Sequence, residues 1–144
     1  MEIARVVASR STCPRRNVGA VVVRNKRLLS SGYNGAPSGL PHCTDEGCLL
    51  MTVKLGDQPA RESCQRAAHA EANAIAQAAL HGVSTNESTV YCTDSPCSNC
   101  AKLIINAGVQ RIVFAGDYPD ELGRRMLEEA GVALHRLGAD GQAR

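Results

Sequence analysis

The sequence predicts an α/β fold in which helices cover a mixed five-stranded sheet. Two patterns carry this prediction. In the second half of the chain, short apolar and β-branched runs alternate with helical segments, which is typical of parallel strands joined by crossover helices. In the first half, two strand-like runs flank a polar pair of residues, which indicates an antiparallel hairpin. The 144 residues are expected to form one domain, 1–144.

The first half begins with an expected short helix over 2–10, whose apolar residues fall on one face. A β-branched run at 18–23 predicts a buried strand. The polar turn at 25–26 then returns the chain into a second strand at 27–32.

The segment 33–66 has little periodicity and is interrupted by glycines and prolines. One short helix is expected within it, at about 48–53. A segment this long without clear structure is uncommon in a compact domain unless it is functional or anchored. Because this Cys-rich insert holds three of the seven cysteines, it carries a candidate anchor of its own.

The second half reads as alternating helices and strands. An Ala-rich segment without Gly or Pro has high helix propensity and ends at Gly82. Pro96 is suited to the first position of the next helix, which Gly108 closes, and Gly131 stops the last helix. The expected helices are 67–81, 96–106 and 119–129, and the expected strands are 88–93, 111–115 and 132–136. The Gly- and Ala-rich tail, about 138–144, is expected to be frayed.

Composition argues against several classes of partner. Lys and Arg total 16 against 14 Asp and Glu, a net charge of +2 that gives no general attraction to nucleic acid or to an anionic membrane. No apolar run reaches the length of about 18 residues that a membrane span needs. With three Tyr, one Phe and no Trp, the chain offers few rings for stacking bases. The first residues lack a secretory pattern, so we expect a cytoplasmic protein without nucleic-acid or membrane partners.

Seven cysteines in a chain without an export signal are poorly explained by disulfides, because the number is odd. In a reducing compartment, thiols at short spacings are better interpreted as metal ligands. Cys97 and Cys100 have such a spacing, and so do Cys43 and Cys48. Cys92 lies in an apolar run and fits equally well as a small buried side chain.

The sequence His-Ala-Glu at 69–71 and Pro-Cys-Ser-Asn-Cys at 96–100 forms the strongest chemical pattern in the chain. Cys97 and Cys100, three apart near a helix N-terminus, can bind one metal together, and the helix dipole favours their thiolate form. His69 would be the third ligand, and three protein ligands with an open position are typical of a catalytic zinc site. The alternative is a structural metal clip.

Glu71 has a separate predicted role. Residues two apart in mid-helix point in nearly opposite directions, but at the first turn both can reach a group that lies beyond the helix end. A carboxylate there can take a proton from a zinc-activated water and pass it to a leaving group. This is the pattern described for zinc deaminases, in which the glutamate is not a metal ligand.

On these motifs the chain resembles the cytidine and deoxycytidylate (dCMP) deaminase superfamily and, within it, the dCMP deaminases. The resemblance covers most of the length, and Gly-Tyr-Asn-Gly at 32–35 is its most specific part. The stretches that carry it are 17–23, 32–37, 69–75, 95–102 and 104–108.

The resemblance implies a three-layer α/β/α fold of the cytidine deaminase type and zinc-dependent hydrolysis of dCMP to dUMP and ammonia. Zinc would activate the water that attacks C4, with Glu71 as the proton shuttle. Asn34 is expected to contact the sugar and the backbone N–H of Ala70 the pyrimidine O2. Tyr118 is a candidate for the pocket wall.

The resemblance also implies a homohexamer that is activated by dCTP and inhibited by dTTP. The effector loop would include Gly32, Tyr33 and Gly35, although a plain turn would show the same residues. The chain departs from related phage enzymes at Gln77 and Leu80, where those enzymes carry an aromatic and a basic residue on the helix face linked to nucleotide selectivity.

Members of this family can carry a second, structural zinc. The expected ligands are four thiolates, which would tie the insert to the N-terminal helix, and His42 could replace one of them. These four are Cys13, Cys43, Cys48 and Cys64.

Three functions remain open from the sequence. The first is dCMP deamination, with free deoxycytidine or cytidine as a variant substrate. The second is deamination of tRNA adenosine on the same zinc scaffold, and the third is a zinc-stapled interaction domain. The residue that binds the phosphate is also open, with Arg24, Lys26, Arg27 and Lys102 as candidates.

Overall fold

The computed structural model describes residues 1–54, 56 and 59–138. Its main sheet has five strands in the order β2-β1-β5-β6-β7. Strands β2, β1 and β5 pair antiparallel, whereas β5, β6 and β7 pair parallel, which confirms the predicted mixed sheet. The strands are β1 (Gly19–Arg24), β2 (Arg27–Tyr33), β5 (Thr89–Asp94), β6 (Arg111–Gly116) and β7 (Ala133–Arg136).

The predicted hairpin joins β1 to β2 through Asn25 and Lys26. Both residues have positive φ, 52° and 62°, as the tightest hairpin turns require. Asn tolerates this conformation better than most residues because its short polar side chain bonds locally. A register shift between Val22 and Val23 bends the strand next to the turn.

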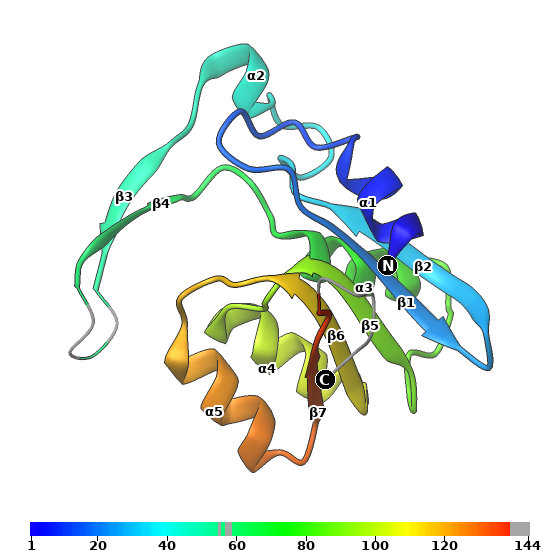
Figure 1. Cartoon of the computed structure of the whole chain (residues 1–144). Helices are drawn as coiled ribbons and strands as arrows, with labels where there is room; N and C mark the ends of the chain where they lie inside the picture. The colour runs from blue at the N-terminus through cyan, green and yellow to red at the C-terminus, as the bar shows by residue number, and fades with distance from the viewer. Residues whose placement is uncertain (55, 57–58, 139–144) are drawn as a thin grey trace.

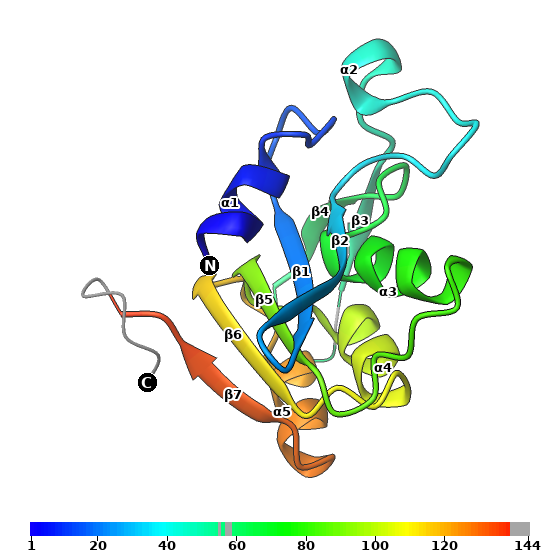
Figure 2. The ribbon, with the colours of Figure 1, turned by 90° about the vertical axis from the view of Figure 1, so that its right-hand side faces the viewer.

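Helices cover both faces of the sheet. Figure 2 shows α1 (Glu2–Ala8) on one face of the sheet and α3 (Ala70–Leu80) and α4 (Ser98–Asn106) on the other. The last helix in the described part of the chain is α5 (Glu121–Glu129). This is the α/β/α layering that the resemblance implied.

Two glycines allow helices to approach the sheet closely. A Cβ at Gly19 would collide with the backbone of α1, and a Cβ at Gly32 would collide with the carbonyl of Ala70 and the N–H of Ala74 in α3. Since any side chain at Gly32 would push α3 away from β2, this glycine fixes where the first turn of α3 lies.

The core lies between the sheet and helices α3, α4 and α5. It is built from the inward-facing residues of the central strands and from one face of each helix. Its largest fully buried side chains are Val22, Val90, Cys92, Ile104, Ile112 and Leu127.

The helix predicted at 48–53 is wrong. The insert instead forms a four-residue helix α2 (Cys43–Glu46) followed by a hairpin of β3 (Leu50–Val53) and β4 (Arg61–Cys64). A short apolar run does not by itself distinguish helix from strand, and here the pairing of Leu50 with Cys64 and of Val53 with Arg61 decides for the strand. Figure 1 shows this hairpin extending as an arm beyond the main sheet.

Element boundaries differ from prediction mainly at helix starts. Helix α3 begins at Ala70 rather than 67, because Ala68 is held in an extended bridge with Gly35 and His69 is the N-cap. Helix α4 begins at Ser98 rather than 96, with Cys97 as its N-cap. The expected fraying of 138–144 lies outside the described residues, apart from Gly138. Among the helices that the structure describes, none is both long and apolar enough to cross a membrane.

Candidate functional site

The N-termini of α3 and α4 bring together the three predicted metal ligands. His69 and Cys97 are the N-caps of the two helices, both with extended backbone, and Cys100 lies in the first turn of α4. The His69 Nδ1 is 3.3 Å from the Cys97 Sγ and 3.5 Å from the Cys100 Sγ. All three ligand atoms lie within 4.8 Å of one another.

This donor set fits zinc. One imidazole and two buried thiols form a set that zinc favours, and three protein ligands leave one tetrahedral position open. Hydrogen bonding to Cys100, and then to His69, lowers the pKa of Cys97 to about 4. The hydrogen bond with Cys97 raises the pKa of His69 to about 9. A separate hydrogen bond between Cys97 and Cys100, together with burial, raises the pKa of Cys100. These groups share protons that a divalent cation would displace.

Glu71 lies in the first turn of α3, beside the three ligands. Its residue is only 4% exposed. Burial raises its pKa to about 7, and the positive charge of His69 opposes that shift. A carboxyl with a pKa near neutrality can both accept and donate a proton at physiological pH.

The metal-ligand group opens onto a cavity of about 330 Å³. This volume is in the range of small-molecule sites. Among the predicted site residues, those that line it are Cys13, Asn34, Cys64, His69, Ala70, Glu71, Cys97 and Tyr118.

Asn34 also has a structural task. Its Oδ1 accepts from the backbone N–H of Val18 at 2.8 Å, and its Nδ2 donates to the carbonyl of Arg16 at 2.8 Å. The amide keeps one further N–H and one lone pair for a ligand in the cavity.

Arginines at the mouth of the cavity were missed by sequence reasoning. Arg15, Arg16 and Arg61 all line it. The guanidinium carbons of Arg16 and Arg61 lie 5.4 and 4.5 Å from the centroid of the Tyr118 ring. Two of these arginines follow Cys13 closely, but only the fold shows that their loop reaches the cavity.

The basic residues proposed from the sequence lie elsewhere. None of the four lines this cavity. Three of them sit at the hairpin turn between β1 and β2, and the fourth is exposed on α4. These residues are Arg24, Lys26, Arg27 and Lys102.

The expected effector residues are engaged in packing. Gly32 lies against α3, and the carbonyl of Tyr33 accepts from Asn73 Nδ2 at 2.8 Å. Gly35 exchanges two backbone hydrogen bonds with Ala68, which leads into the metal-ligand group. None of the three expected effector residues lines the cavity.

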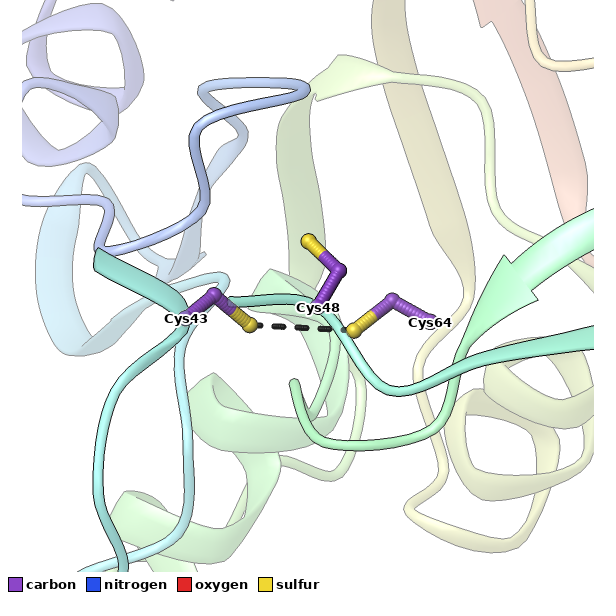
Figure 3. Close-up of side chains that lie close together, drawn as sticks. All are labelled: Cys43, Cys48 and Cys64. Carbon is purple, nitrogen blue, oxygen red and sulfur yellow. Dashed lines mark hydrogen bonds between the residues drawn. The ribbon is translucent and has the colours of Figure 1, made fainter. Parts of the chain in front are cut away.

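The insert brings together a second group of thiols. The ligand atoms of Cys43, Cys48 and Cys64 lie within 4.8 Å of one another, and Figure 3 shows Cys43 facing Cys64 with 3.7 Å between the sulfurs. Cys13 is outside this group and lines the neighbouring cavity. Burial, followed by hydrogen bonding to Cys64, raises the pKa of Cys48. His42 Nδ1 instead lies 3.2 Å from the Thr12 hydroxyl.

The environments of these thiols differ. Burial raises the pKa of Cys43 to about 12. Burial also acts on Cys64, but backbone N–H groups of Ala67 and Arg66 outweigh it and lower its pKa to about 7. Three thiols with one already inclined to ionise form a suitable set for a soft metal ion.

The family model for the cytidine and deoxycytidylate deaminase zinc-binding region matches residues 1–116. The chain belongs to this family. The matched segment contains all seven cysteines, His69 and Glu71, and it ends before α5.

Similar proteins from this family are known. The chain is 40% identical over 141 residues to ComE operon protein 2 of Bacillus subtilis, covering 97% of this chain and 70% of that protein. It is 36% identical over 138 residues to the deoxycytidylate deaminase of Saccharomyces cerevisiae, covering 95% of this chain but only 43% of the yeast protein. The chain therefore spans less than half of that relative.

A solved structure of the family has the same fold. The dCMP deaminase of the cyanophage S-TIM5, in complex with dCMP and dUMP, is 32% identical and superposes with a TM-score of 0.76. The match covers 94% of this chain and 91% of the cyanophage chain.

Proposed function

We propose that this chain is a zinc-dependent deaminase that hydrolyses dCMP to dUMP and ammonia, within pyrimidine nucleotide supply for dTMP synthesis. The observation that carries the proposal is that buried Glu71 lines one cavity together with His69 and Cys97, which form a metal-ligand group with Cys100. The likeness to a cyanophage enzyme crystallised with dCMP and dUMP supports the choice of substrate. The free thiols suit a reducing cytoplasm.

His69, Cys97 and Cys100 would hold the catalytic zinc, which supplies the Lewis acidity that activates water for attack at C4. Glu71 takes the first proton of that water and delivers it to the ring nitrogen N3. It then carries the second proton from the new hydroxyl to the departing amine. The C4–N bond breaks, ammonia leaves, and Glu71 returns to its starting state.

The pyrimidine and sugar are positioned by groups around this centre. The N–H of Ala70 is among the first in α3 and has no intrahelical acceptor, so it is available to the pyrimidine O2. Asn34 offers its remaining amide donor to the sugar. The Tyr118 ring forms one wall of the cavity.

We propose a second, structural zinc held by Cys43, Cys48 and Cys64. Three thiolates leave one tetrahedral position, for which Cys13 or His42 is the candidate from this chain. The close grouping of three thiols at the base of the β3–β4 hairpin supports this site.

We also propose a homo-oligomer, a hexamer by the family resemblance, regulated by dCTP and dTTP. Large apolar side chains left exposed on the helices support self-association, above all Leu80, which is 74% exposed on α3. Light scattering is expected to give six times the chain mass of 15.2 kDa. A monomer at micromolar concentration would contradict the proposed assembly.

Substrate choice is tested by incubating the protein separately with dCMP, CMP, deoxycytidine and a tRNA, with zinc and dCTP present. Loss of cytosine absorbance with dCMP alone is the expected result. Turnover of CMP or deoxycytidine at an equal rate, or inosine formation in the tRNA, would support the proposed deamination but contradict dCMP as the preferred substrate. Inactivity toward all four would overturn the proposed function.

A further inference from the structure

Helix α4, which carries the metal ligand Cys100, begins without a cap of its own. The first four N–H groups of a helix lack intrahelical acceptors, and the side chain of the N-cap residue usually accepts from one of them. Cys97 is the N-cap of α4, but its side chain makes no capping hydrogen bond, and its Sγ lies 3.3 Å from His69 Nδ1 instead. The start of α4 therefore needs an acceptor from another part of the chain.

Asp120 supplies that acceptor from the start of α5. Its Oδ2 accepts from the backbone N–H of Ser98 at 3.0 Å and from the Ser98 hydroxyl at 3.2 Å. Its Oδ1 caps its own helix by accepting from the N–H of Gly123 at 2.9 Å. One carboxylate with a fully buried side chain thus caps two helices, and its negative charge suits the N-terminal end of both.

Gly123 brings α5 directly against the peptide bond that follows Cys97. A Cβ at this position would lie 2.7 Å from the backbone nitrogen of Ser98 and 2.9 Å from the carbonyl carbon of Cys97. Any side chain here would push this peptide or α5 away. The first turn of α5 therefore supports the Cys97–Ser98 peptide by packing as well as through the hydrogen bonds of Asp120.

The chain is also held on the other side of Cys97. The Ser95 hydroxyl donates to the carbonyl of Tyr118 at 3.1 Å and accepts from the Tyr118 N–H at 2.7 Å. The segment 118–123 therefore holds the backbone both before and after Cys97. Since an N-cap residue lies half outside its helix, the direction of its side chain depends on how this backbone is held.

We propose that Asp120 is a positioning residue for the metal centre: by capping α4 in place of Cys97, it leaves the Cys97 thiolate free for the metal and holds it toward His69 and Cys100. The inference rests on the catalytic zinc of the proposed function. Asp120 does not line the cavity, so it acts on the metal only through the backbone of α4. Residues that orient metal ligands in this way typically change metal affinity by about ten- to a hundred-fold.

The test measures zinc affinity by competition with a chromophoric chelator in Asp120→Asn and Gly123→Ala. Every protein compared, including the parent, carries Cys48→Ser, so that zinc at the insert thiols does not obscure the catalytic site. Asp120→Asn is expected to weaken zinc binding about ten- to a hundred-fold, because an amide cannot accept hydrogen bonds at both ends. Gly123→Ala keeps every hydrogen-bonding group but displaces the Cys97–Ser98 peptide, so it should weaken zinc binding as well.

Gly131→Ala is the matched control for a general loss of stability. Gly131 follows the other end of α5 with a φ of 75°, and nothing lies near the position of its Cβ. Alanine there strains the backbone without touching α4, so it should lower the thermal unfolding midpoint but leave zinc affinity within about two-fold of the parent.

Cobalt(II) in place of zinc gives a second readout, because its thiolate charge-transfer absorption depends on the geometry of the cobalt–sulfur bonds. Asp120→Asn and Gly123→Ala should change this absorption, whereas Gly131→Ala should not. If Asp120→Asn does not fold, Gly123→Ala decides the result.

The outcomes separate the two proposals. Unchanged zinc affinity and cobalt spectra in the Asp120 and Gly123 variants would overturn the positioning role, and so would an equal loss in the Gly131 control. A parent protein that takes up no zinc would overturn the proposed function and this inference with it.

Discussion

Glu71 and His69 are two residues apart and yet face one cavity. This is geometrically allowed because His69 is the N-cap, with extended backbone, and Glu71 is the second residue of the helix. The sequence alone indicated this arrangement, since a first helical turn is the place where such neighbours can converge. The burial that moves the pKa of Glu71 to about 7 is a property of the folded chain.

Replacing Glu71 by Gln should remove activity and leave the metal centre intact. Gln has the shape of Glu but cannot carry a proton between water and the leaving amine. We expect kcat to fall by about a hundred- to ten-thousand-fold with unchanged zinc content. Steady-state kinetics with metal analysis checks this.

Glu128→Gln, at an exposed carboxylate on α5, serves as the matched control and should behave as the wild type. A Glu71→Gln enzyme within ten-fold of wild-type kcat would refute the proton-shuttle role, and loss of zinc would point to a ligand instead.

The arginines that line the cavity could not be predicted from the sequence. The metal ligands and Glu71 could be recognised because their spacing along the chain reflects their chemistry. Arg61 could not, because its partner Asp120 is far away in the sequence and no local pattern relates the two. Only the docking of the arm on the segment before α5 brings them together.

At the scale of elements, Asp120 joins the N-termini of two helices. Its Oδ1 accepts from the N–H of Gly123 in α5 at 2.9 Å, and its Oδ2 accepts from the N–H of Ser98 in α4 at 3.0 Å. Since Cys97 precedes Ser98 directly, this carboxylate also fixes the start of the helix that carries two metal ligands. Burial opposes ionisation, but the Ser98 and Gly123 N–H groups prevail and lower the pKa of Asp120.

Asp120→Asn should therefore destabilise the fold in a pH-dependent way. An amide cannot accept at both ends, so at neutral pH we expect a loss of about 2 to 4 kcal/mol in unfolding free energy. Because the folded-state pKa is depressed, the wild-type advantage exists above the unfolded-state pKa of about 4 and disappears as the pH falls through the folded-state value. Denaturant unfolding at pH 7 measures the loss of stability, and the same measurement below pH 4 shows whether the difference from the wild type disappears.

The exposed Asp117 provides a control for this prediction. Within the described residues it pairs with the surface arginines Arg124 and Arg136, so Asp117→Asn should change stability by less than about 1 kcal/mol. A constant difference between Asp120→Asn and the wild type at all pH values would show that the carboxylate charge is not responsible.

The strands of the main sheet and the hairpin that begins it were predictable, whereas the structure of the insert was not. Segments such as 18–23 and 111–115 carry their structure in local composition, because β-branched runs between turn residues suit buried strands. The run at 50–53 is too short and too apolar for its pattern to distinguish a helix from a strand. Its pairing with 61–64 joins segments that are apart in the sequence. The starts of α3 and α4 were predicted too early. The bridge at Ala68 and the N-caps His69 and Cys97 set these starts, not helix propensity.

For the whole molecule, the two groups of thiols lie at separate places and would hold two metal ions per chain. An isolated two-stranded hairpin is at best marginally stable, so the arm of β3 and β4 needs an anchor at its base. Cys43, Cys48 and Cys64 lie at that base. A metal there would stabilise the insert without touching the chemistry at Glu71.

Metal analysis of the purified protein should give two zinc ions per chain. Cys48→Ser should retain one zinc and lower the thermal unfolding midpoint, because it removes a ligand from the insert only. Cys97→Ser should also lose one zinc, but with it all activity. One zinc per active wild-type chain would refute the second site.

The insert leaves the main fold after β2 and returns to it just before His69. Asn34, at the start of the insert, and Arg61, in β4, line the same cavity as His69, so the insert forms part of the cavity wall. A change in the length or sequence of this arm would therefore reshape the wall of the cavity, while His69, Glu71, Cys97 and Cys100 stay in place at the N-termini of α3 and α4.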